Sequence, residues 1–176
     1  KKNDVVAISF HRGYLNFKRD KHIPLTKNIK LNMKSNLFFE NISFYISSFK
    51  NKGIKTLLIN DGPLMQIVAT SESCLMQIKF FGKSDCRISK VQNIHTRTRQ
   101  DIVFNKLALR YSSICQWDPL IKLYENKDYI DVIDDSGKYI MADWHHLTNN
   151  YAEDHLTSNF LDTFNKCFDD ARSKGN

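Results

Sequence analysis

Short, largely apolar runs alternate along the chain with longer stretches of helical periodicity. The runs cover residues 5–8, 55–59 and 114–117. All three runs are predicted to be strands. The first, residues 5–8, is continuously apolar, which favours a strand that is covered on both faces, so it is predicted to be an interior strand of a parallel sheet.

Helices are predicted between and after these strands, because apolar residues recur there at intervals of three and four. The stripes are Phe38, Ile42, Tyr45, Ile46 and Phe49; Phe104, Leu107, Ala108 and Tyr111; and Leu156, Phe160, Leu161, Phe164, Cys167, Phe168 and Ala171. Gly53 follows the first stripe, where a left-handed residue commonly ends a helix. The alternation predicts a three-layer α/β/α fold, with a parallel sheet between two layers of helices. Residues 1–176 are predicted to form a single domain.

Two turns and one long irregular stretch complete the predicted organisation. Residues 60–63, Asn-Asp-Gly-Pro, follow the second strand at its carboxyl end, where open α/β sheets usually bind ligands. Residues 134–137, Asp-Asp-Ser-Gly, predict another turn, and residues 139–141 a short extended piece. Residues 65–95 show no sustained period, so we predict a long excursion with little regular structure.

The composition is that of an ordinary globular domain, with 176 residues of which 41% are hydrophobic and 26% charged. The longest apolar runs fall far short of the roughly 20 residues that a membrane-spanning helix needs, and the N-terminus lacks a signal-peptide pattern. The chain opens on a lysine and reaches a strand almost at once. We therefore expect an excised piece of a longer protein that lacks one edge of its own fold.

The net charge of +7 raises the question of nucleic-acid binding. The basic residues are scattered, without a recognition motif or regularly interleaved aromatic residues, so we expect no nucleic-acid partner. A solvated basic face, turned toward anionic lipid or an acidic glycan, is the simpler interpretation.

The four cysteines fall into two different contexts. Cys74 and Cys86 bracket residues 75–85, where a disulfide would restrict the unfolded chain and hold an otherwise loose excursion. This bridge requires an oxidising compartment, and in the cytosol both thiols would be reduced. Cys115 and Cys167 lie on predicted apolar surfaces, where a free thiol behaves as a small hydrophobic residue.

Asp143 and His146 are the strongest candidates for chemistry. A carboxylate close to a histidine can fix the tautomer of the ring, so that the histidine takes a proton from a weak nucleophile. No Gly-x-Ser-x-Gly or Gly-Asp-Ser sequence supplies that nucleophile within the 176 residues. The alternatives are that Asp143 caps the following turn while His146 packs beneath it, or that Asp143, His145 and His146 bind a metal.

His11 and Arg12 follow the first predicted strand at its carboxyl end. They are candidates for binding an acyl oxygen or an acidic sugar, although Arg12 pairing with a surface carboxylate is the alternative.

Several of these stretches resemble, in order, the SGNH (GDSL-like) esterase domain that is fused to membrane acyltransferase-3 proteins. The stretches are Asp4-Val5-Val6-Ala7-Ile8-Ser9, the cysteines Cys74 and Cys86, Trp117-Asp118-Pro119, Asp134-Asp135-Ser136-Gly137-Lys138-Tyr139, and Asp143-Trp144-His145-His146-Leu147-Thr148. The last is similar to the family motif D-x-x-H-L-[ST]-x-x-G-A and carries most of the specificity.

The resemblance implies a flavodoxin-like parallel sheet whose first strand, with its Gly-Asp-Ser nucleophile turn, would lie upstream of Lys1. It makes His146 the general base and Asp143 its orienting carboxylate. It further implies a monomeric domain in the bacterial periplasm, tethered to the inner membrane through an acyltransferase-3 domain of the same polypeptide. The acceptor would be a glycan such as lipopolysaccharide, with the acetyl group delivered by the membrane domain and acetyl-CoA a candidate source. No cofactor or metal is expected in this domain.

The chain also departs from the family pattern. Tyr151 stands where the motif has glycine, although Ala152 matches. A second cysteine pair is missing, and Tyr124 occupies the first of its places. The glycine and asparagine of the usual oxyanion hole are not recognisable. These departures leave two alternatives open, namely a degenerate module that binds glycan or supports the membrane domain without chemistry, and a carbohydrate acetyl-esterase.

Overall fold

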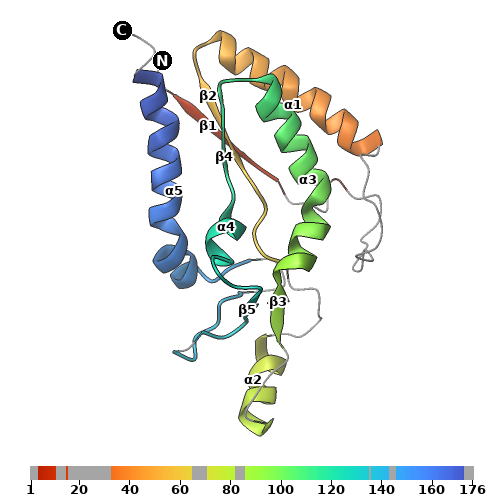
Figure 1. Ribbon diagram of the computed structural model, residues 1–176, viewed down its shortest axis with the longest axis vertical. Coiled ribbons are helices and arrows are strands. Elements are labelled where there is room, and N and C mark those ends of the chain that lie inside the picture. The colour runs from red at the N-terminus through yellow and green to blue at the C-terminus, as the bar shows by residue number, and fades with distance from the viewer. Residues whose placement is uncertain are drawn as a thin grey trace. The chain divides into compact units, whose positions relative to one another are not determined.

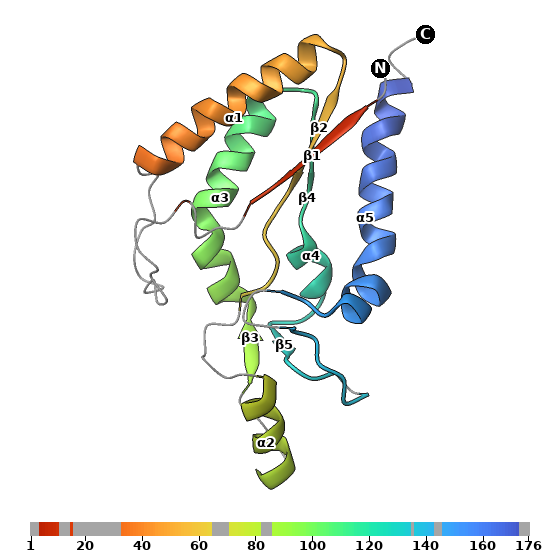
Figure 2. The same ribbon diagram turned by 180° about the vertical axis from the view of Figure 1, so that it is seen from behind.

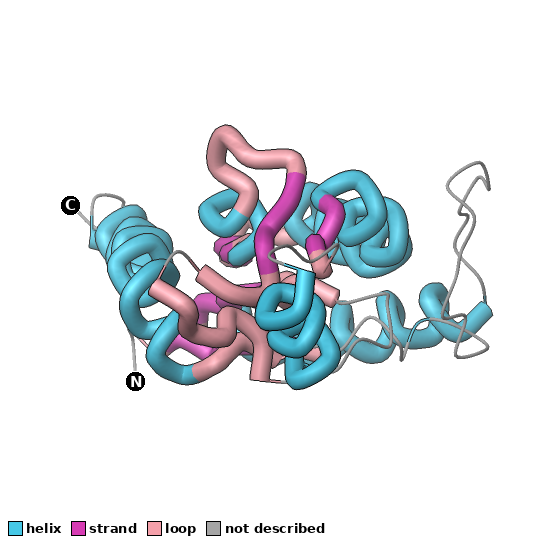
Figure 3. The backbone as a smooth tube through the Cα atoms, turned by 90° about the horizontal axis from the view of Figure 1, so that it is seen from below, coloured by secondary structure: helices cyan, strands magenta, loops and turns pink. Residues whose placement is uncertain are grey.

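The structure is a computed structural model and describes residues 4–10, 15, 33–64, 71–81, 86–134, 136–142 and 146–172. Helix is the predominant regular structure in this part of the chain, as the cyan segments of Figure 3 show. The elements are β1 (Val5–Ser9), α1 (Met33–Asn51), β2 (Lys55–Ile59), α2 (Ser71–Phe81), β3 (Arg87–Ser89), α3 (Lys90–Arg110), β4 (Ile114–Trp117), α4 (Pro119–Leu123), β5 (Tyr129–Asp131) and α5 (Asn149–Arg172). They group into two compact units. Unit 1 comprises Lys1–Asp61, Thr96–Asp118 and Ser158–Asn176, and unit 2 comprises Gly62–His95 and Pro119–Thr157.

A parallel sheet in the order β1-β2-β4 forms the centre of unit 1. Val5 pairs with Lys55 at one end of β1, and Ser9 pairs with Ile59 at the other. On the other side of β2, Thr56 to Ile59 pair in register with β4. Parallel neighbours need a crossover connection, and α1 supplies it between β1 and β2. The predicted parallel α/β sheet is confirmed.

Helices cover both faces of this sheet, because successive residues of a strand point to opposite sides. Leu58 belongs to an apolar cluster with Ile46 of α1 and Phe104 of α3. On the other face, Cys115 of β4 is bonded to Cys167 of α5. Figures 1 and 2 show α1 and the later turns of α3 on one side of the strands and the later turns of α5 on the other.

The position of β1 differs from the prediction. Among the described strands, β1 lies at one edge of the sheet and β2 in the middle, so the interior position predicted for the first run is wrong for this part of the chain. Ala7 is exposed, and Val6 and Ile8 are half-buried. An apolar run identifies a strand, but it does not determine which neighbours the strand has. The outer edge of β1 is of the kind to which a further strand can pair.

The end of α1 follows the prediction in detail. Gly53 has φ of 71°, in the left-handed region that glycine tolerates best. The Gly53 N–H donates to the Lys50 carbonyl oxygen at 3.0 Å, and the Ile54 N–H donates to that of Phe49 at 2.9 Å. This is the Schellman pattern, which satisfies the last carbonyl groups of the helix and turns the chain into β2.

Unit 2 contains the antiparallel pair β3-β5, with Ile88 opposite Ile130. The prediction that residues 65–95 hold little regular structure is wrong, because α2, β3 and the first turns of α3 lie there. β3 and β5 have three residues each, too few for an alternating pattern to be recognised in the sequence. None of the described helices combines the length and the apolar character needed to cross a membrane.

Candidate functional site

His146 lies in a loop of unit 2 whose described residues are Met141, Ala142, His146 and Leu147. Met141 and Leu147 form an antiparallel bridge. Inside that bridge, the Ala142 N–H donates a hydrogen bond of 2.8 Å to the His146 carbonyl oxygen. The main chain of His146 is therefore fixed by its neighbours, while its side chain is exposed.

Thr148 ties this loop to the extended segment before it. Its N–H donates to the Ile140 carbonyl oxygen at 2.8 Å, and its hydroxyl donates to that of Tyr139 at 2.9 Å. The Thr148 carbonyl oxygen then accepts the Ala152 N–H at 3.0 Å, in the first turn of α5. Thr148 and Leu147 of the His-Leu-Thr sequence therefore both have structural roles, Thr148 through these hydrogen bonds and Leu147 through its bridge to Met141.

The segment before the loop is a hairpin closed by Asp134. One carboxylate oxygen of Asp134 accepts the hydroxyl of Ser136 at 2.7 Å and the N–H groups of Ser136 and Lys138 at 2.9 Å. The Ser136 hydroxyl and the Lys138 N–H lower the pKa of Asp134 below its usual value. Gly137 has φ of 81°, which the turn requires. The predicted turn at 134–137 is confirmed for its described residues.

Tyr151 occupies the first turn of α5, near this hairpin. Its ring packs against the ring of His155, one helical turn later, with 4.2 Å between the centroids. Burial raises the pKa of the Tyr151 hydroxyl, and the negative charge of Asp134 raises it further. The aromatic ring at the position of the motif's glycine is thus accommodated on a half-buried helix face.

Of the predicted site residues, His146 belongs to the described part of the chain. Asp143, His11 and Arg12 lie outside the described residues, as do Trp144 and His145. The pairing of Asp143 with His146 and the roles of His11 and Arg12 therefore stay predictions. Within the described residues, no group of three or more His, Cys, Asp or Glu side chains is placed to hold a metal ion.

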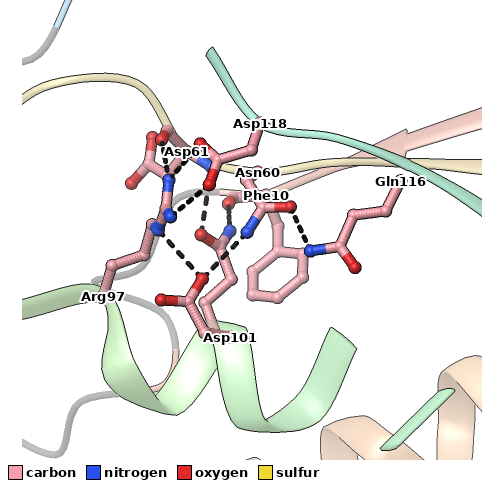
Figure 4. Close-up of polar contacts among 8 residues, drawn as sticks. Phe10, Asn60, Asp61, Arg97, Asp101, Gln116 and Asp118 are labelled. Atoms are coloured by element: carbon pink, nitrogen blue, oxygen red, sulfur yellow. Dashed lines mark hydrogen bonds and ion pairs between the residues drawn. The ribbon is translucent and has the colours of Figure 1, made fainter. Parts of the chain in front are cut away.

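A second polar site, the Arg97 cluster, lies at the carboxyl end of the parallel sheet in unit 1 (Figure 4). Some members follow β1, β2 or β4, Gln116 lies within β4, and the others project from α3. The members are Phe10, Asn60, Asp61, Arg97, Gln100, Asp101, Gln116 and Asp118. This is the edge of an α/β sheet where ligands usually bind, and the Asn60-Asp61 turn was predicted to border it.

Arg97 is the centre of this cluster. Its two terminal nitrogens donate to the two carboxylate oxygens of Asp118, at 2.7 and 2.5 Å, and Nη1 also donates to the Asp61 carbonyl oxygen at 3.3 Å. Nε lies 2.9 Å from Asp101, an ion pair that is misaligned for a hydrogen bond. Burial alone would lower the pKa of the guanidinium, but Asp118 and Asp101 together raise it above its usual value.

Amide side chains connect the remaining members. Asn60 donates to Asp101 at 2.9 Å and accepts from Gln116 at 2.8 Å. Gln100 donates to the Phe10 carbonyl oxygen at 2.9 Å and accepts the Asp61 N–H at 3.0 Å. Each strand end is thus linked to α3 or to the neighbouring strand end. The Arg97 cluster therefore acts as a scaffold that holds the carboxyl edge of the sheet in one geometry.

The motifs and the hydrophobic pattern of the chain do not single out Arg97, Gln100 or Asp101. A signal was present, because Asn93, Arg97 and Gln100 recur at intervals of four and three, and all three are buried. A stripe of polar residues is normally assigned to the solvent face of a helix. The hydrophobic pattern would therefore place these three buried residues on the exposed side of α3.

Two disulfides join the four cysteines, and the predicted use of disulfide bonding is confirmed. One links Cys74 to Cys86 in unit 2, and the other links Cys115 to Cys167 in unit 1. The prediction of free thiols at Cys115 and Cys167 is wrong, because β4 and α5 bring their Cα atoms to 5.8 Å, within bridging distance. Two disulfides indicate an oxidising location, in the periplasm or outside the cell.

Comparison with known proteins gives no match, either to a family model or to a curated protein. The resemblance to the SGNH domain therefore depends on the residues of this chain alone.

Proposed function

We propose that this chain is the SGNH-type part of an O-acyltransferase that acetylates a cell-envelope polysaccharide such as lipopolysaccharide. His146 is the general base, Asp143 orients it, and the nucleophilic serine comes from a segment upstream of Lys1. The observation that carries the proposal is the loop around His146. Leu147 and Thr148 of the D-x-x-H-L-T motif have structural partners in it, and they fix the main chain of a histidine whose side chain is exposed.

The order of the strands supports the same proposal. β1, β2 and β4 follow one another across the sheet without a reversal. In a flavodoxin-like sheet of order 2-1-3-4-5, three consecutive strands of this kind are strands 3, 4 and 5, and strand 1 pairs with strand 3. An upstream strand paired with the outer edge of β1 would occupy the place of strand 1 in that order. Its carboxyl end would then lie beside that of β1, at the switch point where such sheets bind ligands.

The proposed reaction is two acyl transfers through the serine. The serine oxygen attacks the acetyl carbonyl carbon while His146 takes the hydroxyl proton. The bond from the acetyl carbon to the donor's leaving group breaks, and His146 gives the proton to that group. A sugar hydroxyl then attacks the acetyl-serine, its proton passes through His146 to the serine, and the acetylated sugar leaves. Backbone N–H groups near the serine would stabilise each oxyanion.

Both disulfides require an oxidising environment, and the bacterial periplasm is one such compartment. We propose the bacterial periplasm, with the chain tethered to the inner membrane by an acyltransferase-3 domain that delivers the acetyl group. The acceptor is a glycan at the outer face of that membrane.

The test is labelling of the full-length protein with a fluorophosphonate serine probe, followed by peptide mapping by mass spectrometry. We expect a labelled serine upstream of Lys1 and loss of labelling in His146→Ala. His155→Ala, which removes another exposed histidine of unit 2, is the matched control and should label like wild type.

Transfer is separated from hydrolysis by following acetate from donor to acceptor glycan. An acetyl-esterase would release acetate without acetylating the sugar. Absence of labelling in folded protein, together with glycan affinity that His146→Ala leaves unchanged, would show a binding module and refute the catalytic proposal.

A further inference from the structure

The exposed end of helix α2 carries large apolar side chains that no described part of unit 2 covers. Met76, Phe80 and Phe81 are 53%, 66% and 75% exposed. Lys79 is exposed beside them. We refer to these four residues as the α2 tip. Isolated apolar residues on a surface need no explanation, but a contiguous group is typical of an interaction site.

The geometry of α2 presents this group outward. Met76 and Phe80 are four residues apart and share one face of the helix, with Phe81 adjacent at its end. Figures 1 and 2 both show α2 projecting beyond β3 and β5, away from the other described elements of unit 2.

A disulfide fixes the base of this projection. Cys74, which is fully buried, is bonded to Cys86, so residues 75–85 form a closed loop that includes the α2 tip. Cys86 is further held by the Val132 N–H, which donates to its carbonyl oxygen at 3.2 Å. The apolar side chains are therefore displayed from a covalently closed base, which limits rearrangements that would bury them.

The basic residues near the α2 tip favour an anionic partner. Residues 79–90 read Lys-Phe-Phe-Gly-Lys-Ser-Asp-Cys-Arg-Ile-Ser-Lys, with four basic residues and one acidic residue. One of the basic residues, Arg87, is paired with Asp131, and Lys79 is exposed directly beside Phe80. Aromatic residues next to lysines are typical of helices that lie in the interface of an anionic membrane, where the rings enter the headgroup region and the ammonium groups reach the phosphates. An 11-residue helix is too short to span a bilayer, so it would dock on the surface.

We propose that the α2 tip docks onto the surface of an anionic lipid bilayer, with Phe80 and Phe81 inserted between the headgroups. This surface is assigned independently of acyl transfer, and it would orient unit 2 toward the membrane whatever reaction the protein performs.

The test is co-sedimentation of the 176-residue chain with vesicles of phosphatidylglycerol and phosphatidylcholine in equal parts, compared with vesicles of phosphatidylcholine alone. Wild type should bind the anionic vesicles more strongly, and added salt should weaken that binding. Phe80→Ser with Phe81→Ser should lower the partition coefficient by about tenfold or more, since each ring contributes through apolar burial. Phe44→Ser is the matched control, because Phe44 on α1 is 72% exposed and should have no effect.

A fluorescent variant measures insertion directly. Tryptophan emission of Phe80→Trp should shift to shorter wavelength with anionic vesicles and be quenched by brominated lipid, while that of Phe44→Trp should not change. Equal binding by wild type and the double serine variant would overturn the proposal, as would absence of preference for anionic vesicles. Self-association of the chain that the serine variant abolishes, without vesicle binding, would show that the α2 tip joins two copies and would also overturn it.

Discussion

Arg97 and Asp118 form a two-point ion pair across the carboxyl end of the parallel sheet, with 2.7 Å from Nη1 to Oδ1 and 2.5 Å from Nη2 to Oδ2. Their side chains are 5% and 15% exposed. Asp118 directly follows β4, and Arg97 projects from α3, so the pair fixes a strand end against a helix. A buried ion pair gains little over a well-packed apolar pair, but removal of one partner leaves a buried charge without compensation.

Arg97→Met should therefore destabilise the protein strongly. The substitution keeps an unbranched apolar stem but leaves the carboxylates of Asp118 and Asp101 without their cation. We expect the free energy of unfolding to fall by about 3 kcal/mol or more, measured by urea denaturation. Arg87→Met is the control, since Arg87 pairs with Asp131 on the surface and should cost less than about 1 kcal/mol. Equal effects would show that the Arg97 cluster does not brace the sheet.

Tyr124 provides a second internal tie, at the position where the resembled family has a cysteine. Its side chain is fully buried, and its hydroxyl donates to the Ile88 carbonyl oxygen at 3.1 Å and accepts from Asn93 at 3.2 Å. Asn93 in turn donates to the Leu64 carbonyl oxygen and accepts the Leu64 N–H. In unit 2 a hydrogen-bonded network through Tyr124 and Asn93 thus connects β3, α3 and the segment at Leu64.

Tyr124→Phe should lower the free energy of unfolding by about 1 to 2 kcal/mol, because the Ile88 carbonyl oxygen loses a buried donor without a cavity being created. Tyr129→Phe removes the same hydroxyl from an exposed position and should change stability by less than about 0.5 kcal/mol. Urea denaturation of both variants measures the difference. A Tyr124→Phe protein as stable as Tyr129→Phe would mean that the network contributes nothing.

The strands of unit 1 could be predicted because their signal is local. Residues 55–59 form an apolar run between turn residues, and β2 has those bounds. The apolar stripe of Ile42, Ile46 and Phe49 likewise identified α1. What such patterns could not determine was the order of the strands, which depends on pairing between segments about fifty residues apart, as between β1 and β2.

The same distinction between local patterns and distant contacts applies to the candidate site residues. His146 was proposed as a site residue because the motif that contains it is contiguous in sequence. Arg97 was missed because its partners, Asp61 and Asp118, come from separate strand ends and meet only in the folded chain. The bridge from Cys115 to Cys167 was missed for the same reason, since 52 residues separate them and each alone resembles a buried thiol.

Alkylation without reductant, followed by peptide mapping, should find no free thiol at Cys115 or Cys167 in the native protein. Replacing both by alanine should lower the free energy of unfolding by about 2 to 5 kcal/mol, because the bridge closes a long loop of the unfolded chain. The corresponding double variant at Cys74 and Cys86, whose loop spans 12 residues rather than 52, should cost less. Alkylated Cys115 and Cys167 in folded protein would restore the free-thiol interpretation.

Tyr151 predicts a specific loss of stability in alkali. Burial and the charge of Asp134 raise the pKa of its hydroxyl above the ordinary value of 10.0. Below that value the hydroxyl is protonated in both states and contributes no pH dependence. Above it, the unfolded chain releases the proton first, so the folded state binds more protons and the free energy of unfolding falls as pH rises. Tyr151→Phe should therefore reduce the fall in urea midpoint between about pH 9 and 11, and Asp134→Asn, which removes only the charge, should reduce it in part. Parallel curves for wild type and Tyr151→Phe would show that the Tyr151 hydroxyl ionises alike in the folded and unfolded chain.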